Sequence, residues 1–499
     1  MNTHKHLLQI VKLTGGLPED VQQKVEAFFD QLSSSIDMPM LSKTLLIEHF
    51  VSGFEYYLDI GYEIDKIIDL LDISKIGDFY RQGNRQYFSL DNAAIVYPMG
   101  MRYGQMPMFR LSIELKEDVE PSLLQLALDF TIKRFPLLAA IIKNGFFWHY
   151  LETTNNIHLV EKERDIPCKP ISIIGRSRNS FRVLYYKKRI SVEFFHALTD
   201  GSGGLSFIKT LVAEYLRLKG NKIANEKGVL DINGEIDERE FINEFSRAEG
   251  DFDLSTFTDK KSLQLDGKLT RLNINKIIHY VMDTDELRNV SRRYDATITA
   301  YLTAIMFLAA KRCISAKQGL FNIQIPINMR KFNNSITLRN YSMYFNATMD
   351  IAKIEDKEAL IKKMSRQIKE KGTEEEMIHM MMTTRKVIST LSFVPLFVKI
   401  PIMQMAYGYL ANSIIGSTFS NLGKIELPEE MAEQIDKMYF LIAPGRPNRS
   451  TSTLVSVNNK SVFSIIMNDQ DLTYLEEIYS LLKEDGLNIM TEGSAEYES

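Results

Sequence analysis

The segment 191–204, with the sequence SVEFFHALTDGSGG, constrains the fold of this chain more than any other stretch. The residues that lead up to His196 have the pattern of a half-buried strand, and Asp200 follows just before a glycine-rich start of an amphipathic helix. This order places an imidazole where a strand leaves its sheet. A histidine whose backbone turn is fixed in this way has the geometry that a general base needs. The segment therefore predicts an α/β fold and makes His196 the candidate catalytic residue.

Length, charge and cysteine content narrow the class of protein. A chain of 499 residues favours two or three domains over a single core. The formal charge of −4 leaves no basic excess for phosphate groups, which argues against nucleic acid as a partner. Cys168 and Cys313 have no C-x-x-C spacing, and no histidine pairs with a second ligand at metal spacing. We therefore expect no metal site and no disulfide framework, and a reducing, cytoplasmic location.

One uncharged stretch, residues 400–423, raises the question of a membrane segment. It contains Pro401, Gln404 and Asn412, which are costly or awkward in a helix that faces lipid. We expect this stretch to be buried in an ordinary core, with peripheral membrane contact as the alternative. The N-terminal residues also lack the small-residue cleavage site of a signal peptide. The main expectation is therefore a cytoplasmic protein without membrane contact.

Hydrophobic patterning divides the chain into four parts. We expect a helical extension at 1–80, a lobe of strands and helices at 86–220, an acidic crossover or linker at 221–270, and a second lobe at 271–490. The 86–220 lobe contains the segment around His196. Two such halves joined by a crossover predict an α/β architecture with a functional cleft between the lobes.

Local signals place individual elements within these lobes. The alternation at 109–115 predicts a strand with one wet face, and Lys187-Lys188 predicts a hairpin turn inside 181–195. Asp283 has the spacing of a capping residue, and Asn458-Asn459 predicts a second hairpin turn. Further patterns predict helices and strands at 121–133, 277–282, 297–313, 321–327, 341–349, 357–371 and 472–482. We expect the tail 491–499 to be disordered.

Residues 194–201, FFHALTDG, resemble the His-x-x-x-Asp-Gly motif of the coenzyme A-dependent acyltransferase superfamily. That superfamily includes chloramphenicol acetyltransferase, the plant acyl-CoA-dependent acyltransferases and the condensation domains of nonribosomal peptide synthetases. Three further segments, 88–94 (FSLDNAA), 325–330 (IPINMR) and 419–423 (FSNLG), are similar to conserved pieces of bacterial alcohol acetyltransferase-like proteins. The resemblance covers about residues 86–485.

The resemblance implies two chloramphenicol-acetyltransferase-like lobes, each a mixed sheet with helices. It implies transfer of an acyl group from acyl-CoA, or from an acyl carrier protein, to a small alcohol or amine, with no permanently bound cofactor. His196 would be the general base. Asp200 would have a structural role and pair with an arginine, for which Arg330 is the first candidate and Arg339 the second. Gly201 would let the backbone turn without a Cβ clash.

The same resemblance leaves the oxyanion donors less well defined. Ser420 and Asn421, together with backbone N–H groups near Gly201, are the candidates for binding the substrate oxygen. The methionines 377 and 380–382 are expected to serve as adaptable packing, with an acyl or acceptor tunnel as the alternative.

Departures from the superfamily patterns separate its branches. Condensation domains usually carry a second histidine directly before the catalytic one, where this chain has Phe195. The plant Asp-Phe-Gly-Trp-Gly motif is missing, and the lone tryptophan, Trp148, lies elsewhere. These departures favour a free-standing O-acyltransferase. Two alternatives stay open: a non-catalytic module that binds acyl groups or coenzyme A, and a condensation-type enzyme that forms amides on carrier-bound substrates.

Overall fold

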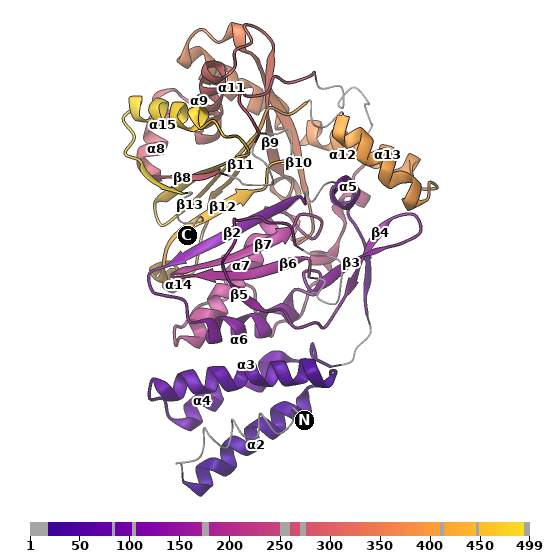
Figure 1. Cartoon of the computed structure of the whole chain (residues 1–499), viewed down its shortest axis with the longest axis vertical. Helices are drawn as coiled ribbons and strands as arrows, with labels where there is room; N and C mark the ends of the chain where they lie inside the picture. Colours follow the sequence, from indigo (N-terminus) through magenta and orange to yellow (C-terminus); the bar gives the residue numbers. More distant parts are fainter. Residues whose placement is uncertain are drawn as a thin grey trace.

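The computed structural model describes residues 18–81, 85–101, 106–171, 179–249, 260–269, 276–409, 414–445 and 449–493. Its first lobe is built on a five-stranded sheet with the strand order β12-β2-β7-β6-β5. The helices α6 (Pro121–Thr131) and α7 (Gly201–Leu218) pack against each other, and α7 packs on β2 and β7 (Figure 1). The strands are β2 (Met108–Leu115), β5 (Val160–Lys162), β6 (Phe181–Tyr186), β7 (Arg189–Phe195) and β12 (Ile435–Ile442).

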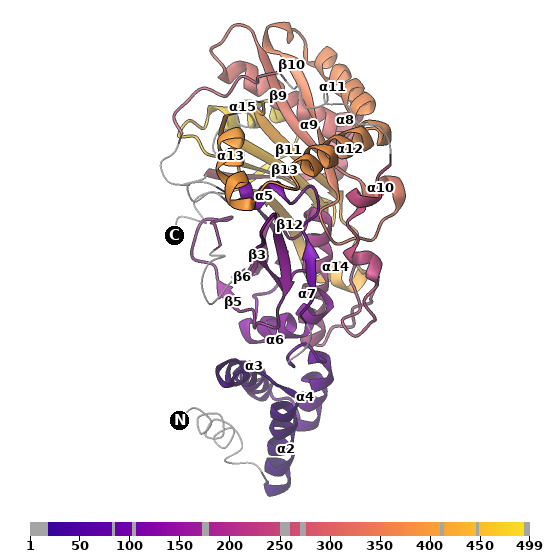
Figure 2. The ribbon, with the colours of Figure 1, turned by 90° about the vertical axis from the view of Figure 1, so that its right-hand side faces the viewer.

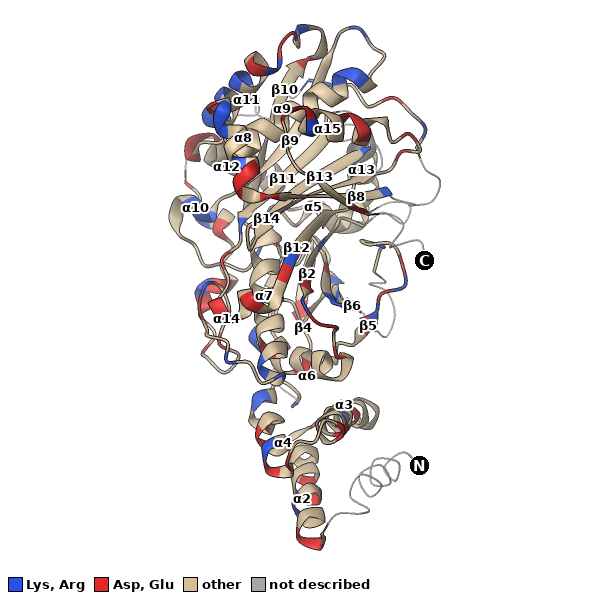
Figure 3. Cartoon of the chain, turned by 90° about the vertical axis from the view of Figure 1, so that its left-hand side faces the viewer, with Lys and Arg blue, Asp and Glu red and all other residues tan. Residues whose placement is uncertain are grey.

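The second lobe is built on a seven-stranded mixed sheet with the order β10-β9-β11-β13-β14-β8-β15. Its strands are β8 (Lys276–Asp283), β9 (Leu320–Asn328), β10 (Ser342–Asp350), β11 (Ser417–Lys424), β13 (Ser450–Val457), β14 (Lys460–Met467) and β15 (Met490–Gly493). Helix α9 (Ile298–Cys313) is buried between α11 (Lys357–Lys371) and α15 (Thr473–Glu484), as its apolar sequence predicts. In Figure 3 the ribbons of the outer helices of this lobe carry many Lys, Arg, Asp and Glu positions, whereas the strands of its sheet are mostly uncharged.

Several local predictions are confirmed. The hairpin of β6 and β7 turns at Lys187, and Asn458 and Asn459 adopt φ values of 48° and 61° between β13 and β14. Two consecutive residues with positive φ are what a tight hairpin turn requires. Asp283 accepts hydrogen bonds from the first turn of α8 (Thr284–Arg293), which is the predicted cap.

Strand β12 crosses between the lobes. It lies in the second half of the sequence, yet it pairs antiparallel with β2 of the first lobe, with Tyr439 opposite Ser112. The pairing covers an edge of β2 that would otherwise expose free backbone groups. We expected residues 271–490 to form the second lobe, and this prediction is wrong for β12, which belongs to the sheet of the first lobe. The sequence of a strand does not indicate which sheet edge the strand joins. The two-lobed α/β fold class is confirmed.

Neither face of strand β2 is exposed to solvent. Arg110 is only 1% exposed, and its guanidinium contacts Glu163 at 2.7 Å and Glu193 at 3.1 Å. The hydroxyl groups of Ser112 and Ser191 are hydrogen-bonded to each other at 2.8 Å and belong to the same network. The alternation of polar and apolar residues in β2 therefore reflects a buried ionic network, since paired charges are tolerated inside a protein.

The N-terminal region packs directly on the first lobe. Its helices α2 (Glu19–Ser35), α3 (Met40–Asp59) and α4 (Ile64–Leu70) lie below α6 in Figure 1. The rings of Phe50 and Phe130 are 5.7 Å apart, and the His49 imidazole lies 2.7 Å from the Asp129 carboxylate. A Cβ on Gly53 would clash with Leu126, so α3 and α6 approach closely. The extension therefore shares one hydrophobic core with the first lobe.

The acidic crossover and the C-terminal tail are more ordered than predicted. Glu240 in the crossover is buried and receives two hydrogen bonds from Arg134, at 2.6 and 2.7 Å. This part of the crossover is thus anchored to the first lobe and is not a solvated linker. Residues 491–493 belong to β15, which pairs with β8, so the tail prediction is wrong there. Residues 494–499 lie outside the described part of the chain.

Candidate functional site

His196 lies directly after β7, at the junction of the two lobes. Its backbone N–H donates to the Pro107 carbonyl at 2.9 Å, which fixes the turn that leaves the strand. The imidazole stacks on the ring of Tyr97, from α5 (Val96–Gly100), with centroids 4.8 Å apart. It also meets the ring of Phe109 edge-on at 5.1 Å. His196 remains partly exposed, so the ring is positioned by aromatic contacts without being sealed in the core.

Asn340 sets the tautomer of His196. The Nδ1 atom of His196 is 3.0 Å from Oδ1 of Asn340, and Nδ2 of Asn340 is 3.5 Å from the Asp91 carboxylate. Because the amide NH₂ only donates, its contact with Asp91 directs the amide oxygen to His196. Nδ1 must therefore carry the proton, and the lone pair lies on Nε2. Nε2 makes no hydrogen bond within the described residues.

The protonation state of His196 suits a base at neutral pH. Burial lowers the pKa of His196, and this outweighs the opposite effects of its own carbonyl, the Asp200 charge and the Asn340 hydrogen bond. A pKa below the ordinary value of about 6.5 leaves the imidazole neutral at pH 7. The geometry therefore provides a neutral imidazole whose Nε2 atom has no hydrogen-bond partner in the described part of the chain.

Asp91 is the far end of this chain of hydrogen bonds. It is buried, accepts from the Ala94 N–H at 2.7 Å, and lies 3.8 Å from the Arg339 guanidinium. Burial raises the pKa of Asp91 to about 6, although Arg339 and the hydrogen bonds act in the opposite direction. Asp91 is consequently ionised at pH 7 and can hold the Asn340 amide in one orientation.

Asp200 connects the motif to the second lobe. Its Oδ1 accepts from the backbone N–H groups of Ser202 and Gly203 at 3.0 and 3.1 Å, which caps α7. Its Oδ2 accepts from Arg330 at 2.7 Å and from the Tyr341 N–H at 2.8 Å. Burial alone would raise the pKa of Asp200, but the Arg330 charge and these donors outweigh it and lower the pKa. The carboxylate thus joins the start of α7 to the second lobe.

The two candidate arginines have different partners. Arg330 pairs with Asp200, and it also donates to the backbone carbonyls of Thr337 and Arg339 at 2.9 and 2.6 Å. Arg339 lies instead beside Asp91 and donates to the carbonyls of Ser89 and Phe241. Arg330 is therefore the partner of Asp200, and Arg339 belongs to the end of the Asp91 chain.

The glycines after Asp200 serve close packing. Gly201 is the first residue of α7 and its φ is not positive, so no left-handed backbone conformation requires a glycine there. A Cβ on Gly201 would lie 3.0 Å from the Leu422 side chain. The constraint is stronger at Gly203, where a Cβ would lie 2.3 Å from the Leu338 carbonyl oxygen. These glycines let the start of α7 approach the second lobe.

Ser420 and Asn421 lie on β11, next to this start of α7. The Asn421 side chain accepts from the Gly423 N–H at 2.7 Å and donates to Thr299 at 3.0 Å. Ser420 is buried in the parallel pairing with β13, opposite Thr453. The structure therefore places this turn beside the site, and it gives Asn421 a role in shaping the turn.

Two expectations about the oxyanion donors change with this geometry. The N–H groups of Ser202 and Gly203 donate to Asp200, so these two are not available to a substrate oxygen. Other donor groups near the start of α7 include the second amide hydrogen of Asn421 and the Ser202 hydroxyl, whose oxygen accepts from Asn328 at 3.0 Å. The sequence had singled out the region of Asp91, but it gave no signal for the roles of Asn340 and Tyr97.

Other groups that the sequence singled out lie apart from His196. His149, His158 and His279 are buried, and burial lowers their pKa values to about 4, 4 and 3. Met377 and Met381 are packed in the second hydrophobic core. Among the described residues, no group of three or more His, Cys, Asp or Glu side chains is arranged to hold a metal.

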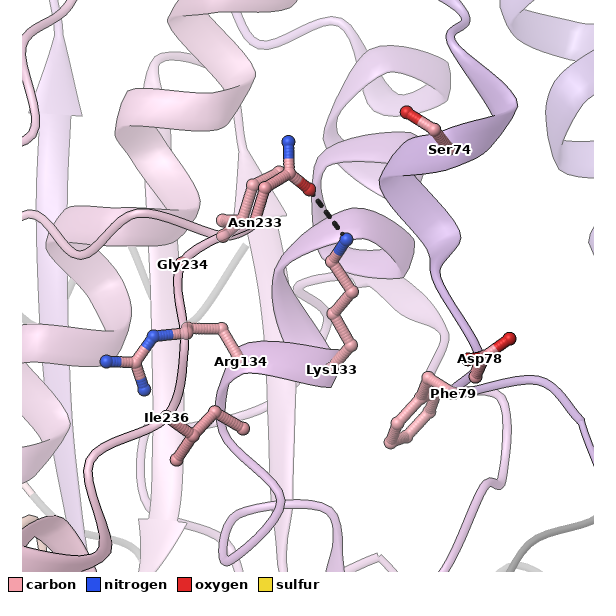
Figure 4. Close-up of a pocket in the computed structure, with 9 residues that line it drawn as sticks. Ser74, Asp78, Phe79, Lys133, Arg134, Asn233, Gly234 and Ile236 are labelled. Carbon is pink, nitrogen blue, oxygen red and sulfur yellow. Dashed lines mark hydrogen bonds between the residues drawn. The ribbon is translucent and has the colours of Figure 1, made fainter.

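A hollow of about 620 Å³ lies between the N-terminal helices and the first lobe (Figure 4). Lys133 and Arg134 line it together with Ser74, Asp78 and Phe79. Lys133 donates to Asn233 at 2.8 Å, and Arg134 is paired with Glu240. The residues around this hollow include none of the predicted site residues, and its two basic side chains are already paired with Asn233 and Glu240.

Comparison with known proteins supports the fold. No protein-family model matches the chain, and no curated protein matches its sequence. Solved structures do match. One is TRI101 of Fusarium sporotrichioides, complexed with coenzyme A and T-2, which is 10% identical in sequence. The match covers 82% of this chain and 99% of the TRI101 chain, with a TM-score of 0.55. The trichothecene 15-O-acetyltransferase TRI3 of the same species is 12% identical, with coverage of 81% and 96% and a TM-score of 0.54.

A third similar structure comes from a peptide synthetase. The EpoB cyclization-docking bidomain of Sorangium cellulosum is 10% identical, with coverage of 80% of this chain and 84% of its own, and a TM-score of 0.51. These identities establish a shared architecture. The chain therefore shares the two-lobed fold of TRI101, TRI3 and the EpoB cyclization-docking bidomain.

Proposed function

We propose that this protein transfers an acyl group from acyl-CoA to an alcohol or amine, with His196 as the general base. The observation that carries the proposal is the placement of His196: its imidazole lies at the lobe junction, with Nδ1 3.0 Å from the amide oxygen of Asn340. The fold supports it, since TRI101, whose solved structure holds coenzyme A, has the same architecture.

The reaction balances with this one base. Nε2 of His196 takes the proton from the acceptor O–H or N–H as the acceptor atom attacks the thioester carbonyl. The tetrahedral intermediate then collapses, the C–S bond breaks, and the thiolate of coenzyme A receives the proton from His196. A side-chain or backbone donor must stabilise the oxyanion, and we assign this to the turn of Ser420 and Asn421 or to the Ser202 hydroxyl.

Asn340 and Asp91 act as positioning residues in this proposal. An imidazole that could rotate or change tautomer would present the wrong nitrogen for part of the time. The Asn340 oxygen fixes Nδ1–H, and the buried Asp91 carboxylate fixes the Asn340 amide. Asp200 and Arg330 hold α7 and the second lobe in register behind the histidine, without contacting the reacting atoms.

Phe195 favours transfer to a free acceptor over condensation on carrier proteins. This side chain is buried in the core of the first lobe and stands where condensation domains carry their additional histidine. A carrier-bound acyl donor remains the nearest variant of the proposed reaction. The EpoB bidomain shares the fold, so a carrier-linked substrate belongs in any test.

Thiol release from a panel of acyl-CoA donors, from acetyl to long-chain, tests the proposal. Each donor is paired with a mixture of alcohols and a mixture of amines, and acylated products are identified by mass spectrometry. We expect thiol release that requires both donor and acceptor. Release only from acyl-pantetheine carriers would assign the condensation-type reaction instead. Saturable coenzyme A binding with no product from any donor or acceptor class would favour the non-catalytic binding module.

A further inference from the structure

Exposed apolar side chains are concentrated on one part of the molecule. Among the described residues, 18 large hydrophobic side chains are exposed, and eight of them lie in two segments. One segment is the end of α12 (Glu374–Thr390) with α13 (Leu396–Tyr409), and the other is the tip between β3 (Ala140–Asn144) and β4 (His149–Thr153). The eight residues, called the apolar face below, are Phe146, Phe147, Val387, Phe393, Phe397, Val398, Ile402 and Met405.

Direct contacts join the two segments into one surface. The Leu396 N–H donates to the Phe146 carbonyl at 2.8 Å, and the Lys399 ammonium donates to the Phe147 carbonyl at 2.8 Å. The same ammonium lies 3.0 Å from the ring centroid of Trp148. Figure 1 shows α13 and β4 on the same side of the molecule, and Figure 2 shows α5 next to α13. The aromatic tip and the helix therefore present their apolar side chains as a single unit.

Helix α13 packs one side against the protein and leaves apolar side chains exposed on the other. Leu396 and Lys399 point into the protein, whereas Phe397 and Met405 are 72% and 68% exposed, and Phe393 just before the helix is 88% exposed. Leaving such side chains in water is unfavourable, and contiguous patches of them mark interaction surfaces. The expectation that residues 400–423 are buried is thus wrong for Ile402 and Met405, whose side chains face outward.

The segment that carries six of the eight apolar-face residues has charged side chains of one sign. Residues 377–425 contain no Asp or Glu, while they contain Arg385, Lys386, Lys399 and Lys424. Arg385 and Lys386 are exposed beside Val387, and Arg385 donates one hydrogen bond to the Ala248 carbonyl. Basic residues next to exposed aromatic and aliphatic side chains are complementary to a surface of anionic lipid headgroups over an acyl layer.

We propose that the apolar face docks on an anionic lipid bilayer. The attachment that we propose is peripheral; within the described residues no helix is long and apolar enough to cross a membrane. Phe146, Phe393 and Phe397 insert below the headgroups, and Arg385 and Lys386 contact the lipid phosphates. Docking also bears on the site, because Gln404 of α13 donates to the Met101 carbonyl, at the end of the helix that carries Tyr97 against His196. The proposal does not depend on the acyl-transfer reaction.

Co-sedimentation with sucrose-loaded vesicles tests the docking. Vesicles of phosphatidylcholine with phosphatidylglycerol are compared with phosphatidylcholine alone, at low salt and at ~0.5 M salt, where surface charges are screened. The test variant combines Phe393→Ser with Phe397→Ser. Its matched control combines Met40→Ser with Leu41→Ser on α3, two side chains that are 62% and 76% exposed and lie away from the apolar face. A third variant combines Arg385→Gln with Lys386→Gln.

The expected results separate lipid docking from its alternatives. The wild type and the α3 control should bind the anionic vesicles alike. The variant with Phe393→Ser and Phe397→Ser should bind them about tenfold or more weakly. The charge variant should bind roughly tenfold more weakly at low salt, and less so at high salt. All three variants should keep the wild-type melting temperature, because the altered side chains face solvent.

Two results would overturn the proposal. One is a wild type that stays in the supernatant with both vesicle types, or equal loss of binding in the α3 control. The other is a wild type that does not bind vesicles and forms dimers in size-exclusion chromatography, while the variant with Phe393→Ser and Phe397→Ser is monomeric. That second pattern would make the apolar face an interface between two copies of this chain.

Discussion

Replacing Asp200 by alanine tests the proposed role of this carboxylate in joining the lobes. The substitution removes the acceptor of three backbone N–H groups, those of Ser202, Gly203 and Tyr341, and leaves the Arg330 guanidinium without its carboxylate. Loss of a helix cap costs about 1 kcal/mol. Removing one partner of a buried ion pair costs about 3–5 kcal/mol. We therefore expect Asp200→Ala to lower the free energy of unfolding by about 4–6 kcal/mol.

The conservative variant Asp200→Asn separates the two contributions. Its amide oxygen can still cap α7, so it should lose the ionic contribution and keep about 1 kcal/mol of capping that Asp200→Ala loses. Urea denaturation followed by circular dichroism measures both variants against the wild type. Arg330→Met completes a double-mutant cycle. We expect the double variant with Asp200→Asn to be more stable than the sum of the single losses by about 2 kcal/mol.

The pH dependence gives an independent readout of the same ion pair. The folded-state pKa of Asp200 is lowered relative to its ordinary value, so its contribution is present above that ordinary value and is lost as the pH falls toward the folded-state pKa. The stability gap between wild type and Asp200→Asn should therefore narrow below a pH of about 4. An Asp200→Ala protein with an unchanged urea midpoint at pH 7 would refute the structural role.

Three further predictions concern His196 and its supporting residues. Because burial lowers the pKa of His196, the wild-type rate should stay level as the pH falls to 7 and decline only below about 6.5, in a pH–rate profile. Asn340→Asp places a carboxylate beside Nδ1 and should move this decline in rate to higher pH by roughly one unit or more. Asn340→Ala removes the hydrogen bond and should lower the plateau rate and move the decline to lower pH. Profiles identical to that of the wild type would exclude the Asn340 contact. Asp91 has a raised pKa of about 6, so its ionisation lowers the stability of the folded protein as the pH rises. Between pH 5 and pH 8 the free energy of unfolding of Asp91→Asn should therefore increase by about 1 kcal/mol relative to that of the wild type, measured in parallel melting experiments. A difference that does not change with pH would contradict the raised pKa.

Local features of the fold and the site were predictable from the sequence because the signals themselves are local. The strand before His196, the cap at Asp283 and the hairpin turn at Asn458-Asn459 each depend on residues a few positions apart. The pairing of Asp200 with Arg330 came from the family resemblance, which supplied information that the spacing of the two residues does not contain.

The features that sequence patterns missed depend on contacts between distant parts of the chain. Asn340 lies 144 residues from His196, and it reaches the imidazole only because the lobes close on each other. Strand β12 joins the sheet of the opposite lobe, and Arg110 has its partners on two other segments. The outward direction of Met405 likewise follows from where α13 packs, since residues 400–423 have no clear amphipathic pattern.

The central claim is that His196 is the base for acyl transfer, and the most direct test compares two histidine variants. His196→Ala removes the proposed base, while His158→Gln alters a buried histidine that stacks on Phe181 away from the site. With the best donor and acceptor pair, we expect His196→Ala to lower kcat by about 10³ with little change in melting temperature. His158→Gln, when folded, should keep a rate close to that of the wild type. A His196→Ala protein that acylates the acceptor at a near-wild-type rate would contradict the account.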